Sequence, residues 1–285
     1  MKEIISGKVR TVYEIDEHRL VIVTTDRISA FDRILSKTVP GKGKVLNAVS
    51  MYWFDHTTDI VRNHILSDKL ADMPAFFQKP EYEGRTVLVE KLTMLPFEFI
   101  VRGYIFGNMW SAYQAGEAFC GQKITGDYQQ AQRLAAPILT PSTKAAEGHD
   151  IYVSLDEVAD ALGKETAEKV GAVCLKLYEA CCRRAYENGI IIADTKFEFG
   201  LDKDGNLVLA DEIFTPDSSR FWSLADYQLG TSPKNYDKQF IRDWLTGNRV
   251  DGEIQYDGVP DDIIDKTADI YQECLRRITG SGQKA

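Results

Sequence analysis

Three acidic residues stand in a stretch whose pattern is otherwise that of two β-strands joined by a tight turn. The stretch is IIIADTKFEFGLDKDGNLVLADE, residues 190–212, and the three acids singled out in its strand patterns are Asp194, Glu198 and Asp211. The dipeptide at 204–205, Asp-Gly, is a favoured two-residue hairpin loop. Counting back from that loop places Glu198 directly opposite Asp211, with the two Cβ atoms about 5 Å apart on one face.

Two carboxylates held this way repel each other by about 3 kcal/mol at an effective dielectric constant near 20. A divalent cation between them would remove this repulsion, and Mg²⁺ binds one or two carboxylates together with phosphate oxygens and water. We therefore predict a magnesium site at Glu198 and Asp211. Asp194 and Lys196 share that face and could contact the nucleotide or a second ion. The alternatives are a shared proton or an exposed edge hairpin, and a three-residue loop would put Glu198 and Asp211 on opposite faces.

Basic residues beside glycines are the candidate phosphate ligands. Lys8 and Arg10 in SGKVR share one face of the first strand, although this can also be an ordinary strand beginning. The loop GKGK at 41–44 could clamp an anion or be a solvated turn. Arg102 and Arg220 follow apolar or hydroxyl-rich segments and suit bidentate phosphate binding, although single arginines commonly form surface ion pairs. The segment TTDRISAFD, residues 24–32, is either a charge-paired turn or part of the site.

The elements that must position these residues change in kind along the chain. Residues 9–15 and 20–25 predict a hairpin, 85–92 and 97–104 predict strands, and 45–61 has helical spacing. Further on, Ser154 and Glu157 form a capping box before a helix, a second helix covers about 166–187, and a last one covers 261–278. The polar segment 141–150 is expected to be a loop. We therefore expect an α+β fold, with a β-rich lobe at 1–100 and an α/β lobe with C-terminal helices at 101–285.

Composition limits the partners and the compartment. The 285 residues carry a net charge of −9, which is unfavourable for binding nucleic acid or an anionic membrane. The sequence has no run of about 20 apolar residues, and its beginning lacks the apolar segment of a signal peptide. The five cysteines show no metal-ligand spacing. We expect a reduced, cytoplasmic protein that acts on small molecules as a monomer or small homo-oligomer.

Taken together, the motifs resemble those of the SAICAR synthetase family of purine biosynthesis. The matching stretches run in the family's order from Ser6 to about Leu245. They are SGKVRTVYE, TTDRISAFD, VPGKGKVLN, VEKLTMLPFEFIVRGYIFGNMW, TPSTKAAEGHD, ADTKFEFG, DEIFTPDSSRFW and YDKQFIRDWL. The resemblance implies a β-rich nucleotide-binding lobe packed on an α/β lobe, similar to protein kinases and ATP-grasp enzymes.

The same resemblance implies an ATP-dependent ligase. Such an enzyme joins carboxyaminoimidazole ribotide and L-aspartate through an acyl phosphate and releases ADP and phosphate. A small-molecule kinase with a hydroxyl acceptor, or a silent nucleotide-binding regulator, would share the nucleotide lobe. Release of ADP that requires both the ribotide and L-aspartate would distinguish the ligase.

Roles carried over from the family cover most of the candidate residues. ATP would be bound by Lys8, Arg10 and the chain at Glu90, Lys91 and Leu92, and Mg²⁺ by Glu198 and Asp211 with Asp194 in support. The ribotide phosphate would be bound by Arg102, Ser219 and Arg220, and also by Asn108, where the family usually has serine. Lys196 and Lys238 would lie near the reacting phosphate or the substrate carboxylates, with Asp194 as a third catalytic group. L-Aspartate would contact Lys144, Glu147 and Asp150.

Overall fold

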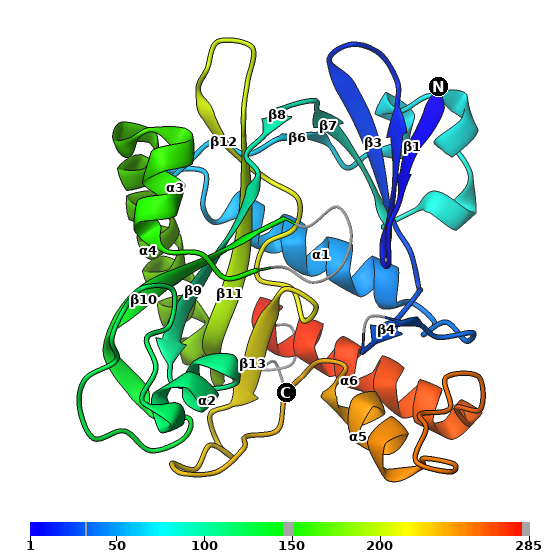
Figure 1. The fold of residues 1–285 in the computed structure, drawn as a ribbon. Helices are drawn as coiled ribbons and strands as arrows, with labels where there is room; N and C mark the ends of the chain where they lie inside the picture. The colour runs from blue at the N-terminus through cyan, green and yellow to red at the C-terminus, as the bar shows by residue number, and fades with distance from the viewer. Residues whose placement is uncertain (32, 145–150, 281–285) are drawn as a thin grey trace.

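Two large β-sheets, a small two-stranded sheet and six α-helices form the described part of the computed structural model, which covers residues 1–31, 33–144 and 151–280 (Figure 1). The first sheet is antiparallel, and its strands lie in the order β1-β2-β3-β7-β6. Their bounds are β1 (Lys2–Ser6), β2 (Arg10–Glu14), β3 (Arg19–Thr24), β6 (Ile65–Ser67) and β7 (Thr86–Glu90). Three 3₁₀ turns, η1 (Leu70–Asp72), η2 (Ala75–Phe77) and η3 (Pro80–Tyr82), precede β7, and β4 (Ser29–Ala30) pairs separately with β5 (Arg33–Ile34).

The second sheet has the order β10-β9-β11-β12, and two further strands, β8 and β13, pair with β11. Their bounds are β8 (Thr93–Met94), β9 (Phe97–Tyr104), β10 (Arg133–Thr143), β11 (Ile190–Leu201), β12 (Leu207–Ala210) and β13 (Ser219–Ser223). The long strand β11 is therefore the centre of this sheet. The chain passes from the first sheet to the second between Glu90 and Thr93.

The helices are α1 (Lys42–Asp55), α2 (Asn108–Ala115), α3 (Leu155–Leu162), α4 (Lys164–Glu187), α5 (Gln239–Gly247) and α6 (Asp261–Thr279). In Figure 1, α3 and α4 lie beside the second sheet on the left, and α1 crosses the middle of the molecule towards the first sheet. Helix α1 packs against α6, and α4 packs against β9, β10 and β11. No helix in the described part of the chain is long and apolar enough to cross a membrane.

Alternation along the strands gives the second sheet one apolar and one polar face. Phe97, Phe99 and Val101 of β9 are buried with Phe197 and Phe199 of β11 in the core that includes the apolar residues of α4. Because successive side chains point to opposite faces, the intervening residues line the other face. They are Glu98 and Arg102 of β9, and Asp194, Lys196 and Glu198 of β11.

Most of the predicted elements are confirmed. The hairpin of 9–15 and 20–25 forms as β2 and β3, the capping box of Ser154 and Glu157 is present, and α6 covers 261–279. Two expectations were wrong. Helix α1 ends at Asp55, where the Thr57 hydroxyl donates to the carbonyl of Trp53 at 2.8 Å and the chain turns. Residues 141–143 belong to β10 and not to a loop, while 145–150 lie outside the described residues.

The expected hairpin register was also wrong. Glu198 pairs with Ala210, not with Asp211. The loop has three residues, 203–205, because the N–H of Asp202 bonds to the carbonyl of Asn206 at 3.0 Å. The side chain of Asp202 stabilises this longer loop by accepting hydrogen bonds from the N–H groups of Asp204 and Asn206 at 2.9 and 2.8 Å. An aspartate side chain that bonds to the backbone ahead of it favours such a turn, and this preference prevailed over the two-residue Asp-Gly loop.

Candidate active site

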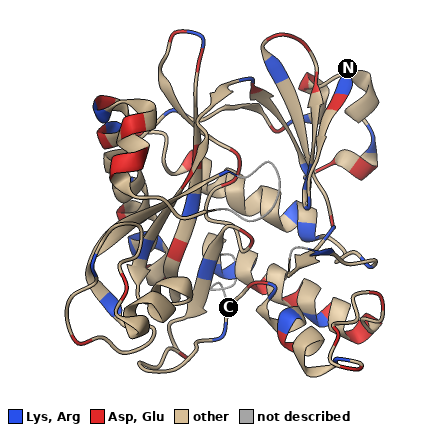
Figure 2. Ribbon diagram, viewed as in Figure 1, with Lys and Arg blue, Asp and Glu red and all other residues tan. Residues whose placement is uncertain are grey.

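The polar face of β11 carries a buried cluster of acidic and basic side chains, and Figure 2 shows both kinds of charge along this strand. The ammonium of Lys196 lies 3.2 Å from Oε1 of Glu198 and also contacts Glu98. The other carboxylate oxygen of Glu198 contacts Lys144. Glu198 is only 4% exposed, and burial favours its neutral form, but Lys196 and Lys144 outweigh burial and lower its pKa. Glu198 is therefore held as a carboxylate.

Lys196 is held in its charged form by the same cluster. Burial acts to lower its pKa, but Glu198, Asp211 and Glu98 together raise it well above the ordinary value. Its side chain is nevertheless 27% exposed. The cluster thus presents a permanent positive charge at the centre of the polar face, where it could neutralise a phosphate or a carboxylate.

Asp211 reaches this cluster without pairing with Glu198. It follows the last residue of β12 and has a left-handed φ of 58°, so the alternation of the strand does not continue through it. Its Oδ1 lies 3.6 Å from Arg10, and its charge raises the pKa of Lys196. Glu212 contacts Arg10 directly. Burial acts to lower the pKa of Arg10, but the carboxylates of Glu212 and Asp211 outweigh burial, so the pKa is raised above its ordinary value.

The predicted magnesium site depends on two acids, Glu198 and Asp211. Within the described ranges, no group of three or more His, Cys, Asp or Glu side chains is arranged to hold a metal. Glu198 and Asp211 still offer carboxylate oxygens beside the same ammonium, and Mg²⁺ takes one or two carboxylates when phosphate oxygens and water complete its shell. Their donor set therefore fits a magnesium ion that binds together with a nucleotide.

Asp194 lies elsewhere on β11 and contacts two arginines. Its Oδ2 accepts a hydrogen bond from Nη1 of Arg102 at 3.0 Å and contacts Nη1 of Arg220. The β-pairing explains this arrangement, because Asp194 is directly opposite Arg102 on β9 and Arg220 on β13. Arg102 is 3% exposed, whereas the side chain of Arg220 is 32% exposed. Two guanidinium groups share one carboxylate, so a net positive charge remains for an anion.

A tyrosine that the sequence analysis missed completes this end of the face. The hydroxyl of Tyr152 accepts from Nη2 of Arg102 at 3.2 Å and from Nδ2 of Asn108 at 3.3 Å. Asn108 begins α2 directly after Gly107, which has φ of 59°. A Cβ atom at Gly107 would lie 3.0 Å from the guanidinium of Arg220. The two arginines and Asn108 are thus brought together from three elements.

The candidate nucleotide residues lie on the first sheet and on the connection to the second. Gly7 forms a tight turn in which its N–H donates to the carbonyl of Arg10 at 2.8 Å; Lys8 in this turn is exposed. A pocket between this sheet and α1 is lined by apolar residues such as Ile22 and Val87, with Arg10 and Asp211 also in its lining. Positive and negative groups therefore stand beside an apolar recess, but the recess is only about 20 Å³ in volume and has room for about one water molecule.

Several polar groups of residues 90–92, which were expected to contact ATP, bond to other parts of the protein. The N–H groups of Glu90 and Lys91 donate to the carbonyls of His64 and His18 at 2.8 and 2.7 Å. The Lys91 side chain pairs with Glu14 at 2.6 Å. Leu92 packs beside Gly200 of β11, where an added Cβ would lie 2.7 Å from that of Leu92. The structure therefore brings Leu92, but not the side chain of Lys91, towards the second sheet.

Of the remaining candidate residues, some lie near the polar face of β11 and others lie outside the described residues. Ser219 is buried and its hydroxyl shares a hydrogen bond of 2.7 Å with that of Thr195. Lys238 lies 4.0 Å from Asp217. The ammonium of Lys144 contacts the Glu198 carboxylate. Glu147 and Asp150 lie outside the described residues.

Three of the acidic or basic groups near these candidates were missed. Glu98 could have been found, because it is an acid within the apolar strand FEFIVRGY, the same signal that singled out Glu198. Glu212 is adjacent to Asp211 and has the same kind of signal. Lys42 gave none, since the GKGK loop was expected to be a solvated turn or an anion clamp. Lys42 is the fully buried first residue of α1.

The segment TTDRISAFD contains a charge pair, as one of its two interpretations predicted. Asp26 lies 3.0 Å from Arg85.

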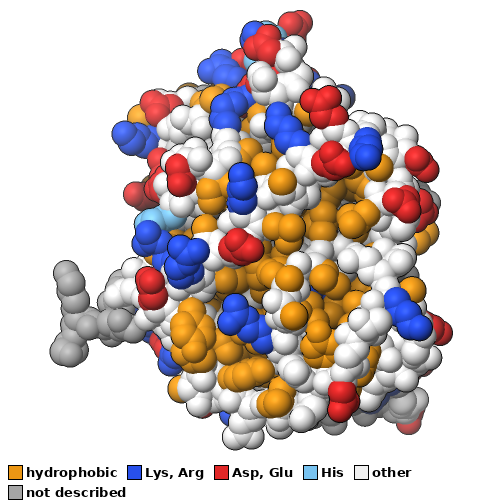
Figure 3. Space-filling model, turned by 90° about the vertical axis from the view of Figure 1, so that its left-hand side faces the viewer, with side chains coloured by type: hydrophobic (Ala, Val, Ile, Leu, Met, Phe, Trp, Pro, Cys, Tyr) orange, Lys and Arg blue, Asp and Glu red, His pale blue; other side chains and the backbone are white. Residues whose placement is uncertain are grey.

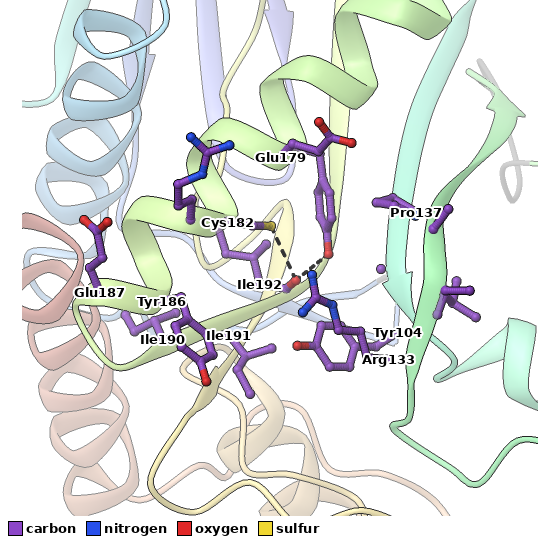
Figure 4. A pocket seen from close by; sticks show the side chains of 16 residues that line it. Tyr104, Arg133, Pro137, Glu179, Cys182, Tyr186, Glu187, Ile190, Ile191 and Ile192 are labelled. Carbon is purple, nitrogen blue, oxygen red and sulfur yellow. Dashed lines mark hydrogen bonds between the residues drawn. The ribbon is translucent and has the colours of Figure 1, made fainter.

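A larger pocket, of about 630 Å³, lies away from all of these residues. Figure 3 shows the face of the molecule that is on the left of Figure 1, and many hydrophobic side chains gather on it. The pocket lies between α4 and the beginnings of β10 and β11. Figure 4 shows Tyr104, Arg133 and Cys182 around it, with Cys182 directed at the carbonyl of Ile192. None of the candidate site residues lines this pocket, so its size does not make it the active site.

Comparisons with known proteins identify the family of the chain. A family model described as SAICAR synthetase matches residues 3–257. The chain is 48% identical over 282 residues to the phosphoribosylaminoimidazole-succinocarboxamide synthase of Lachnospira eligens, covering 96% of this chain and 94% of that protein. The protein of the same name from Chromobacterium violaceum is 44% identical over 281 residues, covering 98% and 99%.

A solved structure is similar over nearly the whole chain. SAICAR synthase from Saccharomyces cerevisiae, complexed with SAICAR, is 41% identical, with a TM-score of 0.89 over 98% of this chain and 94% of that one. The expected α+β, SAICAR synthase-like fold is therefore confirmed.

Proposed function

Because the chain belongs to the SAICAR synthetase family, we propose that the polar face of β11 is where carboxyaminoimidazole ribotide and L-aspartate are joined. The protein is an ATP-dependent amide ligase of purine biosynthesis, and it forms SAICAR, ADP and phosphate. The observation that carries the proposal for the site is Lys196, a partly buried ammonium between Glu98 and Glu198. On the same strand, Asp194 gathers Arg102 and Arg220.

The two lobes divide the work in this proposal. Residues 1–100 supply the nucleotide site, with Lys8 and Arg10 at the phosphates and the chain near Leu92 at the adenine. Residues 101–285 supply the metal and substrate sites. The position of Arg10 supports this division, because Arg10 belongs to β2 of the first sheet yet bonds to Glu212 beyond β12 of the second. The phosphates would therefore lie at the junction of the two sheets.

Mg²⁺ would be held by Glu198 and Asp211, and when bound it would neutralise charge on the phosphate oxygens. Lys196, between Glu98 and Glu198, would hold its ammonium against the reacting phosphate or the substrate carboxylate. Lys238, whose side chain is 15% exposed, would serve the same anions. Asp194 contacts Arg102 and Arg220, and its role in this proposal is to position these two arginines.

Binding of the ribotide follows from the arginine end of the face. The guanidinium groups of Arg102 and Arg220 would receive the ribotide phosphate, with Ser219 and the Asn108 amide beside them. Bidentate guanidinium–phosphate pairs are strong and directional, so this end would fix the ribotide in one orientation. Its carboxylate would then point along β11 towards Lys196. Lys144 and Asp150 would contact L-aspartate.

The chemistry needs two balanced steps. A carboxylate oxygen of the ribotide attacks the γ-phosphorus of ATP, and the bond from that phosphorus to the β–γ bridging oxygen breaks, which releases ADP. The amine of L-aspartate then attacks the acyl carbon, and phosphate leaves with the electrons of the broken carbon–oxygen bond while the amine loses a proton. Both steps depend on alignment and on charge neutralisation, for which the fixed lysine and arginine side chains are suited.

We further propose a cytoplasmic enzyme, monomeric or a small homo-oligomer, with no nucleic-acid or membrane partner. The net charge of −9 supports this, since a basic field is what such partners require.

A coupled assay of ADP release, with each substrate omitted in turn, tests the proposed function. We expect ADP release only when ATP, the ribotide and L-aspartate are all present. ADP release with a hydroxyl compound in place of L-aspartate and the ribotide would overturn the ligase and favour a kinase.

A further inference from the structure

A lysine is completely buried beside the candidate site. Lys42 is 0% exposed although it is the first residue of α1. Its position is electrostatically unfavourable, because the beginning of a helix already carries partial positive charge and burial of an ammonium costs several kcal/mol. Burial accordingly lowers the pKa of Lys42, and Asp217 opposes this shift. Asp217 is the counterion, with Oδ2 at 2.7 Å from Nζ of Lys42.

Asp217 joins three helices to one turn. Its Oδ1 accepts a hydrogen bond from the Tyr271 hydroxyl of α6 at 2.6 Å. Its Oδ2 lies 4.0 Å from Lys238, which immediately precedes α5. The ammonium of Lys42 also lies 5.4 Å from the ring centre of Tyr271. The carboxylate is thus fixed from α1 and α6, and Lys238 is the more distant of its two cations.

The turn that carries Asp217, residues 215–219, leads directly into the site. The carbonyl of Ser218 accepts from the N–H of Lys196 at 3.0 Å. The next residue, Ser219, bonds to Thr195, and Arg220 follows it. A displacement of Asp217 would therefore move groups on both sides of the proposed reaction centre.

We propose that Lys42 is a positioning residue for the ligase reaction: by binding Asp217 it keeps the Lys238 ammonium available to the substrate anions. Without Lys42, Lys238 would be the only cation within 4.0 Å of the Asp217 carboxylate among the described residues, although the charge of Asp217 also acts on Arg10. Lys238 already lies 4.0 Å from Oδ2 of Asp217, and the carboxylate would then draw it into a closer ion pair and away from the substrates. This inference rests on the proposed function, because it assumes that Lys238 serves the reacting groups.

The test is a double-mutant cycle on the full chain. Lys42→Met keeps the length of the side chain but leaves Asp217 without its nearest partner. We expect kcat for ADP release to fall at least tenfold, while the Kd for ADP stays within twofold. Adding Asp217→Asn removes the stranded carboxylate, so we expect the double variant to regain at least half of the lost logarithm of kcat. Lys164→Met, at the exposed first residue of α4, is the matched control and should leave kcat unchanged.

Two outcomes of this experiment would contradict the positioning role of Lys42. A double variant that is slower than Lys42→Met would mean that Lys42 only fills space, and wild-type kcat in Lys42→Met would refute the proposal. If Lys42→Met does not fold, Tyr271→Phe tests the same carboxylate with less disturbance, since it removes only the hydroxyl that bonds to Asp217. We expect kcat of Tyr271→Phe to fall at least threefold. An unchanged kcat would count against the proposal. The wild-type substrate-omission assay separates the two hypotheses, because a failure of the proposed function appears there before any variant is made.

Discussion

The ammonium of Lys196 lies 3.2 Å from the carboxylate of Glu198, two residues away on the same face of β11. Both side chains are anchored a second time, Lys196 by Glu98 and Glu198 by Lys144. The four groups form an alternating chain of charge, so each is electrically compensated while Lys196 stays partly open to solvent. A site prepared in this way does not need to reorganise when a charged substrate arrives.

Replacement of Glu198 should damage both activity and stability. Glu198→Gln leaves Lys144 and part of Lys196 without their anion, and breaking a buried ion pair is strongly destabilising. We expect kcat to fall at least a hundredfold and the free energy of unfolding to fall by about 2 kcal/mol. Urea denaturation checks the second figure, with Asp204→Asn at the exposed hairpin loop as the control. A more stable Glu198→Gln variant would show that the acids repel each other and are not bridged by lysines.

Asp211 should control the requirement for magnesium. Chelation with EDTA is expected to abolish ADP release by the wild type, and added Mg²⁺ should restore it. In Asp211→Asn, we expect the Mg²⁺ concentration for half-maximal activity to rise at least tenfold, because one of two carboxylate ligands is lost. The measurement is a magnesium titration at fixed substrate concentrations. An unchanged midpoint would remove Asp211 from the metal site.

Arg102 should act on the ribotide and not on ATP. Arg102→Lys keeps the charge but loses the forked geometry that contacts Asp194, Thr140 and Tyr152. We expect KM for the ribotide to rise about tenfold, which corresponds to about 1.4 kcal/mol of binding, with KM for ATP within twofold. Arg133→Lys is the matched control, because Arg133 is on the neighbouring strand β10 and lines the pocket away from the site. A rise confined to KM for ATP would contradict the assignment.

His64 should make stability depend on pH. Burial lowers its pKa from 6.5 to about 4, although Asp211 partly opposes this. Below pH 6.5 the unfolded chain binds a proton that the folded protein does not accept until the pH nears 4. Stability should therefore decrease as the pH falls from 6.5 to 4, by about 3 kcal/mol in total from this residue.

Denaturant midpoints across this pH range provide the measurement. His64→Phe, which can still pack against Phe54, should flatten the dependence between pH 6.5 and 4. His18→Gln, at an exposed position, should leave it unchanged. An equal slope in wild type and His64→Phe would show that other groups cause the loss.

Two glycines should respond oppositely to alanine. At Gly43, a Cβ atom would lie 2.4 Å from the carbonyl oxygen of Thr24, and backbone cannot easily yield. We expect Gly43→Ala to lower the free energy of unfolding by about 2 kcal/mol. At Gly247 nothing lies within 4 Å of the added atom, so Gly247→Ala should be neutral or stabilise by about 0.5 kcal/mol. Thermal unfolding of both variants checks this contrast, which equal losses would contradict.

Elements with a strong local signal were predictable. The hairpin of β2 and β3 has β-branched and apolar residues around a polar turn, and α3 has a complete capping box. Errors arose where a local side-chain bond decided between neighbouring possibilities. The carboxylate of Asp202 lengthened the β11–β12 loop by one residue, and this changed the partner of Glu198.

The candidate site was predictable as a set of residues but not as a set of contacts. Acids within apolar strands identified Glu198 and Asp194, and the ordered motifs identified Arg102 and Arg220. Their partners come from distant segments: Asp194 is 92 residues from Arg102 along the chain, and Lys42 is 175 residues from Asp217. Sequence spacing carries no information about such pairs.

The sequence by itself determined which residue types would be available, which face of each strand they would occupy, and which family the chain resembles, because strand alternation and motif order are local properties. Only the tertiary structure decided which charges neutralise each other. Asp194 pairs with Arg102 and Arg220, Lys144 with Glu198, and Lys42 with Asp217. Electrostatic energy depends on distance in space and on burial, and both are fixed only when the sheets and helices pack.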